Sequence, residues 1–275
     1  MPLIAMNREI GSLGKEVAAG LEQALGIRVR HHEIIDHLAN RARVRKSHVI
    51  SFLEGKQGLL ERFTTDQLRM RILTADEIMA MAESSDGVIL RGWGATALLK
   101  EVPHAVRVCV SASRRTRIRR MMERLNTDDA QKVERIVDEN DESARAVMRR
   151  HFHVEPRDIN EYDMGFNTDR VSVERCVDEI VKMVKSPEFS ETGESRARLA
   201  NVALAHHVRA ALRMHHSTEH CTVRVTADAG LVQLHGTVDY VEQSEACSDI
   251  ARGIKGVRVI ENHLHIAETG SPQDS

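Results

Sequence analysis

Residues 3–18 read LIAMNREIGSLGKEVA, and this stretch decides the fold of the first part of the chain. Its first residues, Leu3 to Met6, form a short apolar run that is typical of a buried strand. A glycine-containing turn follows, and Gly14-Lys15 then opens a helical pattern. Such an arrangement forms a phosphate cradle, because backbone N–H groups converge on the anion at the helix N-terminus and the lysine adds positive charge.

The loop departs from the phosphate-binding pattern GxxxxGK[ST] at two positions. Glu9 stands where the pattern has its first glycine, and Glu16 stands where it has the Ser or Thr that binds Mg²⁺. Taken alone, the loop therefore leaves two interpretations open: a phosphate site, or a structural turn that precedes a helix.

Further apolar runs alternate with helical patterns along the first two thirds of the chain. The expected strands are Ile27–Arg30, Val88–Leu90, Ala105–Val110 and Asp163–Asn167. Charged helices are expected over 114–126 and 128–152, and a broken helical insert over 41–64. Strands that alternate with helices in this way predict an α/β fold with a parallel sheet flanked by helices.

A composition change near residue 185 indicates a second domain. The segment that follows is rich in Ser, Pro, Glu, Thr and Gly, and is the best linker candidate. Beyond it, a helix at 199–214, strands at 221–226 and 231–235, a helix at 238–254 and a last strand predict a small α+β module of α-β-β-α-β order. The expected parts are a domain over 1–185, a linker over 186–195, a domain over 196–267 and a disordered tail over 268–275.

Composition excludes several classes of protein. The 275 residues suffice for about two domains, and 41% hydrophobic residues with a net charge of −2 exclude a disordered chain. Aromatic residues make up only 3% and no basic arm is present, so no nucleic-acid partner is expected. No apolar stretch approaches the roughly 18 residues of a membrane span and no signal peptide is recognisable, so we expect a cytoplasmic protein without a transmembrane segment.

Arginines follow the ends of the expected strands. Arg91 comes directly after one strand, Arg117 and Arg120 follow the next, and Arg145 lies in the helix beyond. Ligands bind at the carboxyl ends of strands in open α/β sheets, and arginine suits phosphate because it can donate two hydrogen bonds at once. The alternative is that 114–124 is a solvated charged helix that pairs with acidic 128–142.

Residues 1–185 resemble the cytidylate kinase-like family of P-loop nucleoside monophosphate kinases. The resemblance is carried, in order, by Arg8–Ala18, His31–Ile35, Arg91–Gly94, Ala112–Arg120 and Tyr162–Thr168. The loop is similar to the family's own variant R-E-x-G-S-x-G-x-x-[IV]-A, which commonly lacks the first glycine and the Ser or Thr of the general pattern, as this chain does at Glu9 and Glu16. His31 and Gly92 stand where the family's D-x-E-I-I and G-R-D-x-G motifs have aspartate, which leaves the choice of acceptor open.

The resemblance implies transfer of the γ-phosphoryl group of ATP to a nucleotide-like acceptor. Residues implied to bind ATP are Gly11, Ser12, Leu13, Gly14, Lys15 and Glu16. Those implied to act in phosphoryl transfer are Lys15, Arg117, Arg120 and Arg145, and those implied to bind the acceptor are Arg91, His31 and Asp36. Mg²⁺ is expected, with Ser12 as its candidate ligand and binding through water as the alternative. A catalytically silent nucleotide sensor and a pair of purely structural modules are the rival hypotheses.

Residues 196–267 resemble the BON domain. The resemblance rests on Val232-x-Leu234-x-Gly236-x-Val238 and on Gly256-Val257. It implies a regulatory or docking module that binds a lipid, a small ligand or a protein. Eight of the 15 histidines lie in this part of the chain, and His235, His263 and His265 are candidates for a metal or pH-sensing site, with solvated surface histidines as the alternative.

Overall fold

The computed structural model describes residues 1–31, 33–54, 66–84, 86–92 and 94–267. It divides into two compact units, Met1–Arg196 and Ala197–Ser275. His32 and Trp93, which belong to two of the family-like motifs, lie outside the described residues, as does the tail expected to be disordered.

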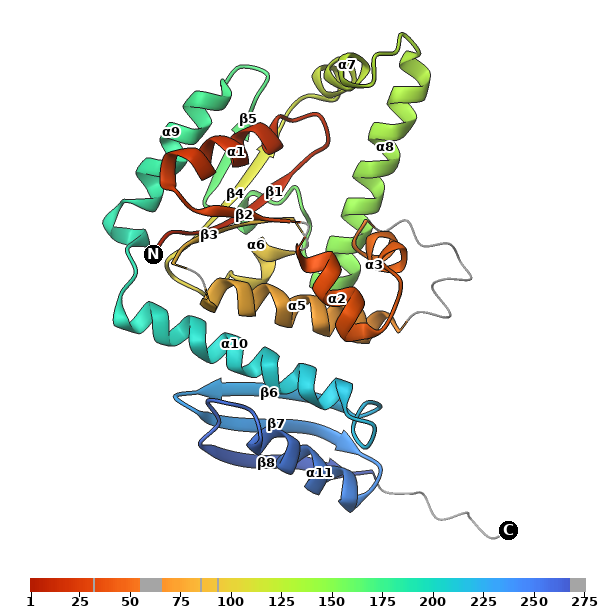
Figure 1. Cartoon of the computed structure of the whole chain (residues 1–275), viewed down its shortest axis with the longest axis vertical. Coiled ribbons are helices and arrows are strands. Elements are labelled where there is room, and N and C mark those ends of the chain that lie inside the picture. The colour runs from red at the N-terminus through yellow and green to blue at the C-terminus, as the bar shows by residue number, and fades with distance from the viewer. Residues whose placement is uncertain (32, 55–65, 85, 93, 268–275) are drawn as a thin grey trace. The chain divides into compact units, whose positions relative to one another are not determined.

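A parallel sheet forms the centre of the first unit (Figure 1). Its strands are β1 (Leu3–Arg8), β2 (Arg28–Arg30), β3 (Val88–Arg91), β4 (Ala105–Ser111) and β5 (Met164–Asn167). They pair in the order β2-β3-β1-β4-β5, and every pair is parallel. This confirms the predicted α/β class and the strands expected from the apolar runs.

Helices cover both faces of this sheet. In Figure 1, α1 and α9 lie on one face, and α5 and α6 lie on the other. The helices of the unit are α1 (Gly14–Leu25), α2 (Glu33–Ala42), α3 (Lys46–Leu53), α5 (Gln67–Ser84), α6 (Ala95–Leu98), α7 (Arg114–Leu125), α8 (Ala130–Val147) and α9 (Val173–Val184). Ile4 and Met6 of β1 pack with Val17 of α1 and Ile180 of α9 in one core cluster. Because β1 is covered on both faces, its sequence is a continuous apolar run rather than an alternating one.

Several boundaries differ from the expected ones. The expected insert over 41–64 contains α3, and its last ten residues lie outside the described part of the chain. Helix α8 ends at Val147 and continues as a π-helical turn over Met148–Phe152. Helix α10 begins at Gly193, six residues before the expected start, and so takes in the end of the expected linker.

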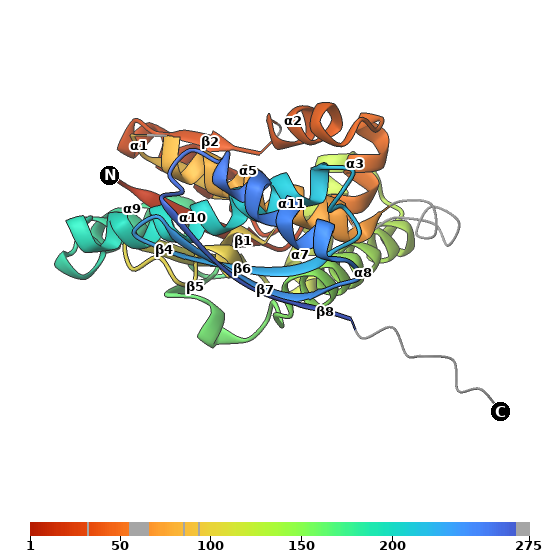
Figure 2. The same ribbon diagram turned by 90° about the horizontal axis from the view of Figure 1, so that it is seen from below.

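The second unit has the predicted α-β-β-α-β order. Its elements are α10 (Gly193–Met214), β6 (Thr222–Asp228), β7 (Leu231–Val238), α11 (Val241–Arg252) and β8 (Val259–Ile266). Strand β6 is antiparallel to β7, and β7 is parallel to β8. Leu204 and Val208 of α10, Cys247 of α11, and Val232 and Leu234 of β7 share one core cluster, so both helices cover the same face of the sheet (Figure 2).

A membrane-spanning helix is not found in the described ranges: none of the helices there is both long and apolar enough.

The π-helical turn at the end of α8 buries His151. Its ring lies 4.7 Å, centroid to centroid, from the ring of Phe52 in α3. Burial lowers the pKa of His151 to about 4, and the positive charges of Arg150 and Arg71 act in the same direction. The folded chain therefore holds this imidazole neutral at pH values at which an unfolded chain binds a proton.

We expect the free energy of unfolding to fall as the pH is lowered from about 6.5 to about 4, because only the unfolded state takes up the His151 proton in that range. The full shift corresponds to about 3 kcal/mol. In urea unfolding across this range, the free energy of unfolding of His151→Phe should depend less on pH than that of the wild type. The pH dependence that is left comes from His104, because burial lowers its pKa as well. His153→Gln removes an exposed neighbour whose charge is the smallest of the causes that lower the His151 pKa, so this variant should keep most of the wild-type pH dependence. Equal pH dependence in all three proteins would contradict the assignment.

Candidate functional site

A cavity of about 460 Å³ lies over the loop that joins β1 to α1. Arg8 and Arg91, the last residues of the neighbouring strands β1 and β3, both line it. The loop contributes every residue from Gly11 to Glu16, and α7 contributes Arg120 from the other side. The cavity therefore stands at the carboxyl ends of the strands, where open α/β sheets bind ligands.

Glycine is required at two positions of this loop. Gly11 has a φ of +76°, and a Cβ there would lie 2.8 Å from the carbonyl oxygen of Arg117. A Cβ on Gly14 would lie 2.7 Å from the Cβ of Arg8. Leu13 also adopts a left-handed conformation, with a φ of 61°, which costs a residue with a side chain about 1–2 kcal/mol. The loop thus holds a strained, close-packed shape, as phosphate loops do.

Hydrogen bonds from outside the loop set the direction of its peptide groups. Arg120 donates to the Gly11 carbonyl oxygen at 3.3 Å, and the Thr168 hydroxyl donates to the Ser12 carbonyl oxygen at 2.9 Å. The Ser12 carbonyl and the Leu13 N–H belong to the same planar peptide and point in opposite directions. Because Thr168 bonds to this carbonyl, the Leu13 N–H faces away from Thr168. Helix α1 has no side-chain cap, so its first N–H groups can serve an anion.

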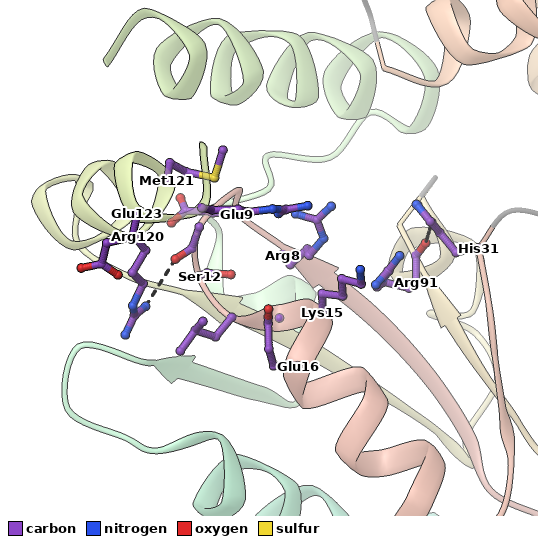
Figure 3. A pocket seen from close by; sticks show the side chains of 14 residues that line it. Arg8, Glu9, Ser12, Lys15, Glu16, His31, Arg91, Arg120, Met121 and Glu123 are labelled. Carbon is purple, nitrogen blue, oxygen red and sulfur yellow. Dashed lines mark hydrogen bonds between the residues drawn. The ribbon is translucent and has the colours of Figure 1, made fainter. Parts of the chain in front are cut away.

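Positive charge converges on the cavity. Figure 3 shows the side chains of Arg8, Lys15 and Arg91 pointing toward a common space above the loop. Burial lowers the pKa of Arg8, and the neighbouring charges of Arg91 and Arg124 lower it further. Burial also lowers the pKa of Arg91. Cations that repel one another in a half-buried space are stabilised by an anion, so this electrostatic arrangement favours a phosphate ligand.

A buried hydroxyl group lies in the loop. Ser12 is fully buried, and its hydroxyl has no hydrogen-bond partner within the part of the chain that the structure describes. A buried hydroxyl without a partner is costly, and a phosphate oxygen is an acceptor to which it could donate. Gly11, Gly14 and Lys15 would surround the phosphates, and oxygens of Ser12 or Glu16 could hold Mg²⁺, which binds oxygen ligands.

Arg117 does not line this cavity, although the sequence placed it among the phosphoryl-transfer residues. Only 2% of its surface is exposed. Its terminal nitrogens donate to both carboxylate oxygens of Asp141, at 2.8 and 2.7 Å, and its Nε donates to the Ala112 carbonyl oxygen at 3.2 Å. Burial alone would lower the pKa of Arg117, but the Asp141 hydrogen bonds and the charge of Glu9 raise it.

The other predicted site residues fall into two groups. Arg120, Arg91 and His31 line the cavity together with the loop. The His31 Nδ1 lies 3.1 Å from the Arg91 carbonyl oxygen, which joins the ends of β2 and β3.

Arg145 and Asp36 lie away from the cavity. Arg145 is paired with Glu155 at 3.5 Å, and Asp36 is paired with Lys46 at 2.8 Å, all with substantially exposed side chains. The structure therefore does not bring these two residues to the loop.

The candidate histidines of the second unit are only partly brought together. His235 and His263 are register partners on β7 and β8, and their rings stack 4.8 Å apart. His265 pairs with Thr237 instead. Among the residues that the structure describes, no group of three His, Cys, Asp or Glu side chains has metal-binding geometry.

Family models identify both parts of the chain. The model of the cytidylate kinase-like family matches residues 3–170. The chain belongs to the cytidylate kinase-like family. The BON domain model matches residues 201–268, so the second unit is a BON domain. No curated protein matches the chain.

Several solved structures are similar to the kinase-like part of the chain. An uncharacterized protein from Eubacterium ventriosum ATCC 27560 is 20% identical, with a TM-score of 0.53 over 68% of this chain and 99% of its own. Shikimate kinase from Bacteroides thetaiotaomicron is 14% identical, with a TM-score of 0.42 over 67% of this chain and 99% of its own. Deoxyadenosine kinase from M. mycoides with bound dATP is 9% identical, with a TM-score of 0.38 over 66% and 99%.

Two arginines in the cavity of this cytidylate kinase-like chain were given no role by the sequence analysis. Arg8 was read only as part of the loop motif, and Arg124 only as part of the charged helix over 114–124. The position of Arg8 at the end of β1, next to Arg91 at the end of β3, was the signal that could have found it. No such signal marks Arg124 in the sequence, because this residue reaches the cavity only through the way in which α7 packs.

Replacing Arg117 should destabilise the kinase-like unit far more than replacing an arginine with similar but exposed contacts. Arg117→Ala leaves Asp141 without its bidentate partner, a loss of about 3–5 kcal/mol for a buried pair. Arg114 on the same helix also forms two bonds to an aspartate, Asp138, but both side chains are about half exposed. Arg114→Ala should destabilise the unit much less, because exposed ion pairs contribute little to stability. Chemical unfolding of both variants tests this, and equal losses would contradict it.

Proposed function

We propose that the chain is an ATP-dependent kinase that transfers the γ-phosphoryl group of ATP to a nucleotide-like acceptor, and that it acts in the cytoplasm, where ATP is supplied. The observation that carries the proposal is the cavity itself, in which a glycine loop at a helix N-terminus meets Arg8, Lys15 and Arg91. Phosphoryl transfer needs mainly positioning and neutralisation of charge, and this site offers both.

Each part of the cavity has a role in this proposal. Lys15 and the loop amides bind the β- and γ-phosphates, with Mg²⁺ supplying further charge neutralisation. Arg91, at the end of β3, binds the phosphate of the acceptor, and His31 lies beside it. Arg8 lies within electrostatic reach of Arg91 and so can contact the phosphoryl group between donor and acceptor. Arg117 acts as a positioning residue that supports the loop from behind.

The acceptor side lacks the aspartate that reads the base in true cytidylate kinases. Gly92 stands there with a φ of +87°, and a Cβ at that position would meet no atom within 4 Å. The backbone conformation rather than lack of space therefore favours glycine. With no carboxylate at this point, the acceptor base is read by other groups or not read, and an acceptor other than CMP is expected.

Lys15→Ala should weaken ATP binding at least about tenfold, since a charge-assisted hydrogen bond to phosphate is worth about 1.5–3 kcal/mol. Calorimetric titration with ATP in Mg²⁺ measures this. Lys182→Ala, at an exposed lysine of α9, serves as the matched control and should bind as the wild type does. Unchanged ATP affinity in Lys15→Ala would show that the phosphate-loop assignment is wrong.

The second candidate function is a nucleotide sensor that binds ATP without turnover. One observation favours it: three of the predicted transfer arginines are engaged by the protein, Arg117 by Asp141, Arg120 by Thr168 and Arg145 by Glu155. A panel of nucleoside mono- and diphosphates, assayed for release of ADP, separates the two functions. Turnover with any acceptor supports the kinase, whereas tight ATP binding without turnover supports the sensor.

We assign the BON domain a regulatory or docking role toward a lipid, a small ligand or a protein. In this proposal it acts through its own surface, because the candidate phosphoryl-transfer cavity is built wholly from residues of the kinase-like unit.

A further inference from the structure

Glu16 is an unexpected residue to find beside a phosphate site. It follows Lys15 in the first turn of α1, where phosphate loops otherwise carry a neutral hydroxyl. Its side chain is exposed and lines the cavity over the loop. A carboxylate suits a helix N-terminus, but beside a triphosphate it is repelled unless a cation lies between the two.

The electrostatics place the Glu16 carboxylate within the group of cations at the site. Its negative charge raises the pKa of Arg8 and also that of Arg91, in opposition to the lowering effect of burial. The carboxylate therefore lies within reach of the two arginines to which we assign the transferring phosphoryl group and the acceptor. In Figure 3, Glu16 and Lys15 leave the same turn of α1 beside the cavity.

The other acidic groups of the cavity are less suited to hold a metal. Glu9 is already neutralised, since it pairs with Arg117 at 3.4 Å and with Arg157 at 3.0 Å. Glu123 belongs to α7 rather than to the loop. Glu16 forms no ion pair within 4 Å with any residue that the structure describes.

Ser12, the ligand expected from the sequence, is enclosed. It is fully buried, and its Oγ lies 3.4 Å from the place that a Cβ on Gly14 would take. Ser12 lines the cavity, but its buried hydroxyl has little room beside it for a hydrated metal ion, whereas the Glu16 side chain is exposed. Mg²⁺ is commonly held by one or two carboxylates together with phosphate oxygens and water, and a carboxylate in this place meets that preference.

We propose that the Glu16 carboxylate is the protein ligand of the Mg²⁺ that accompanies ATP, in place of the usual hydroxyl. This inference rests on the proposed nucleotide site. The carboxylate should therefore have opposite effects on ATP affinity with and without the metal. It attracts the metal complex of ATP, and it repels ATP that carries no metal. A neutral hydroxyl would provide only the attraction.

The test measures ATP binding by isothermal titration calorimetry in excess Mg²⁺ and, separately, in EDTA. In Mg²⁺, Glu16→Gln should bind ATP about tenfold more weakly than the wild type, the scale of one lost charged contact. In EDTA the same variant should bind ATP more tightly than the wild type, because a repelling charge is gone. The reversal of order between the two conditions is the expected result, and a purely structural role of Glu16 would not produce it.

Three further variants sharpen the test. Glu123→Gln makes the same substitution on the other side of the cavity and should retain the metal dependence of the wild type. Ser12→Ala should change affinity by the same factor in both conditions. Glu16→Ser, which restores the hydroxyl of other phosphate loops, should bind ATP in Mg²⁺ with less dependence on the metal than the wild type. Electron paramagnetic resonance of Mn²⁺ with ADP should show loss of protein-bound metal in Glu16→Gln alone.

The outcomes separate this inference from the function on which it rests. If the wild type binds ATP and Glu16→Gln shifts the affinity equally in both conditions, or if Ser12→Ala loses the metal dependence, the assignment of the ligand is overturned and the nucleotide site stands. If the wild type binds no ATP in either condition, the proposed function itself is overturned, and the ligand assignment with it.

Discussion

The buried guanidinium of Arg117 holds the loop between β1 and α1 and the helices α7 and α8 in one arrangement. It binds both oxygens of Asp141 in α8 and the carbonyl of Ala112 at the end of β4, and it lies 3.4 Å from Glu9 of the loop. Its own carbonyl oxygen packs against Gly11 so closely that no side chain fits between them. A charge that is buried this fully has to be paired, so the loop, the strand end and α8 are fixed together.

Arg120 supports the loop in a similar way. Arg120, one helical turn further along α7, bonds to Thr168 at the end of β5 and to the Gly11 carbonyl, while Thr168 bonds to the Ser12 carbonyl. Both arginines thus hold the loop close to α7, while Arg8, Lys15 and Arg91 converge on the cavity from the strand ends and from α1. In the proposed site, Arg117 and Arg120 contribute mainly shape, and Arg8 and Arg91 at the strand ends contribute the charge that a phosphate would meet.

Much of this fold could be read from the sequence, because the signals were local. The continuous apolar runs of β1 and β3 and the Gly-Lys helix start depend only on neighbouring residues, and each strand lies where it was expected. The function of Arg117 could not be read in the same way. Its partner Asp141 is 24 residues distant, and both lie in charged helical patterns that are equally typical of solvated faces. The π-helical turn after α8 escaped for a related reason, since burial of His151 results from packing against α3.

The two departures of the loop from the common phosphate-binding pattern differ in their physical effect. Glu9, in the place of the first glycine, forms ion pairs with Arg117 and Arg157, which neutralise its charge. Glu16, in the place of the hydroxyl, keeps its charge directed at the cavity and acts on Arg8 and Arg91. One acidic substitution therefore stabilises the loop and the other alters its electrostatics. Glu9 therefore makes the loop more rigid. Glu16 gives the proposed site an extra negative charge, which is balanced only when a cation enters together with the phosphates.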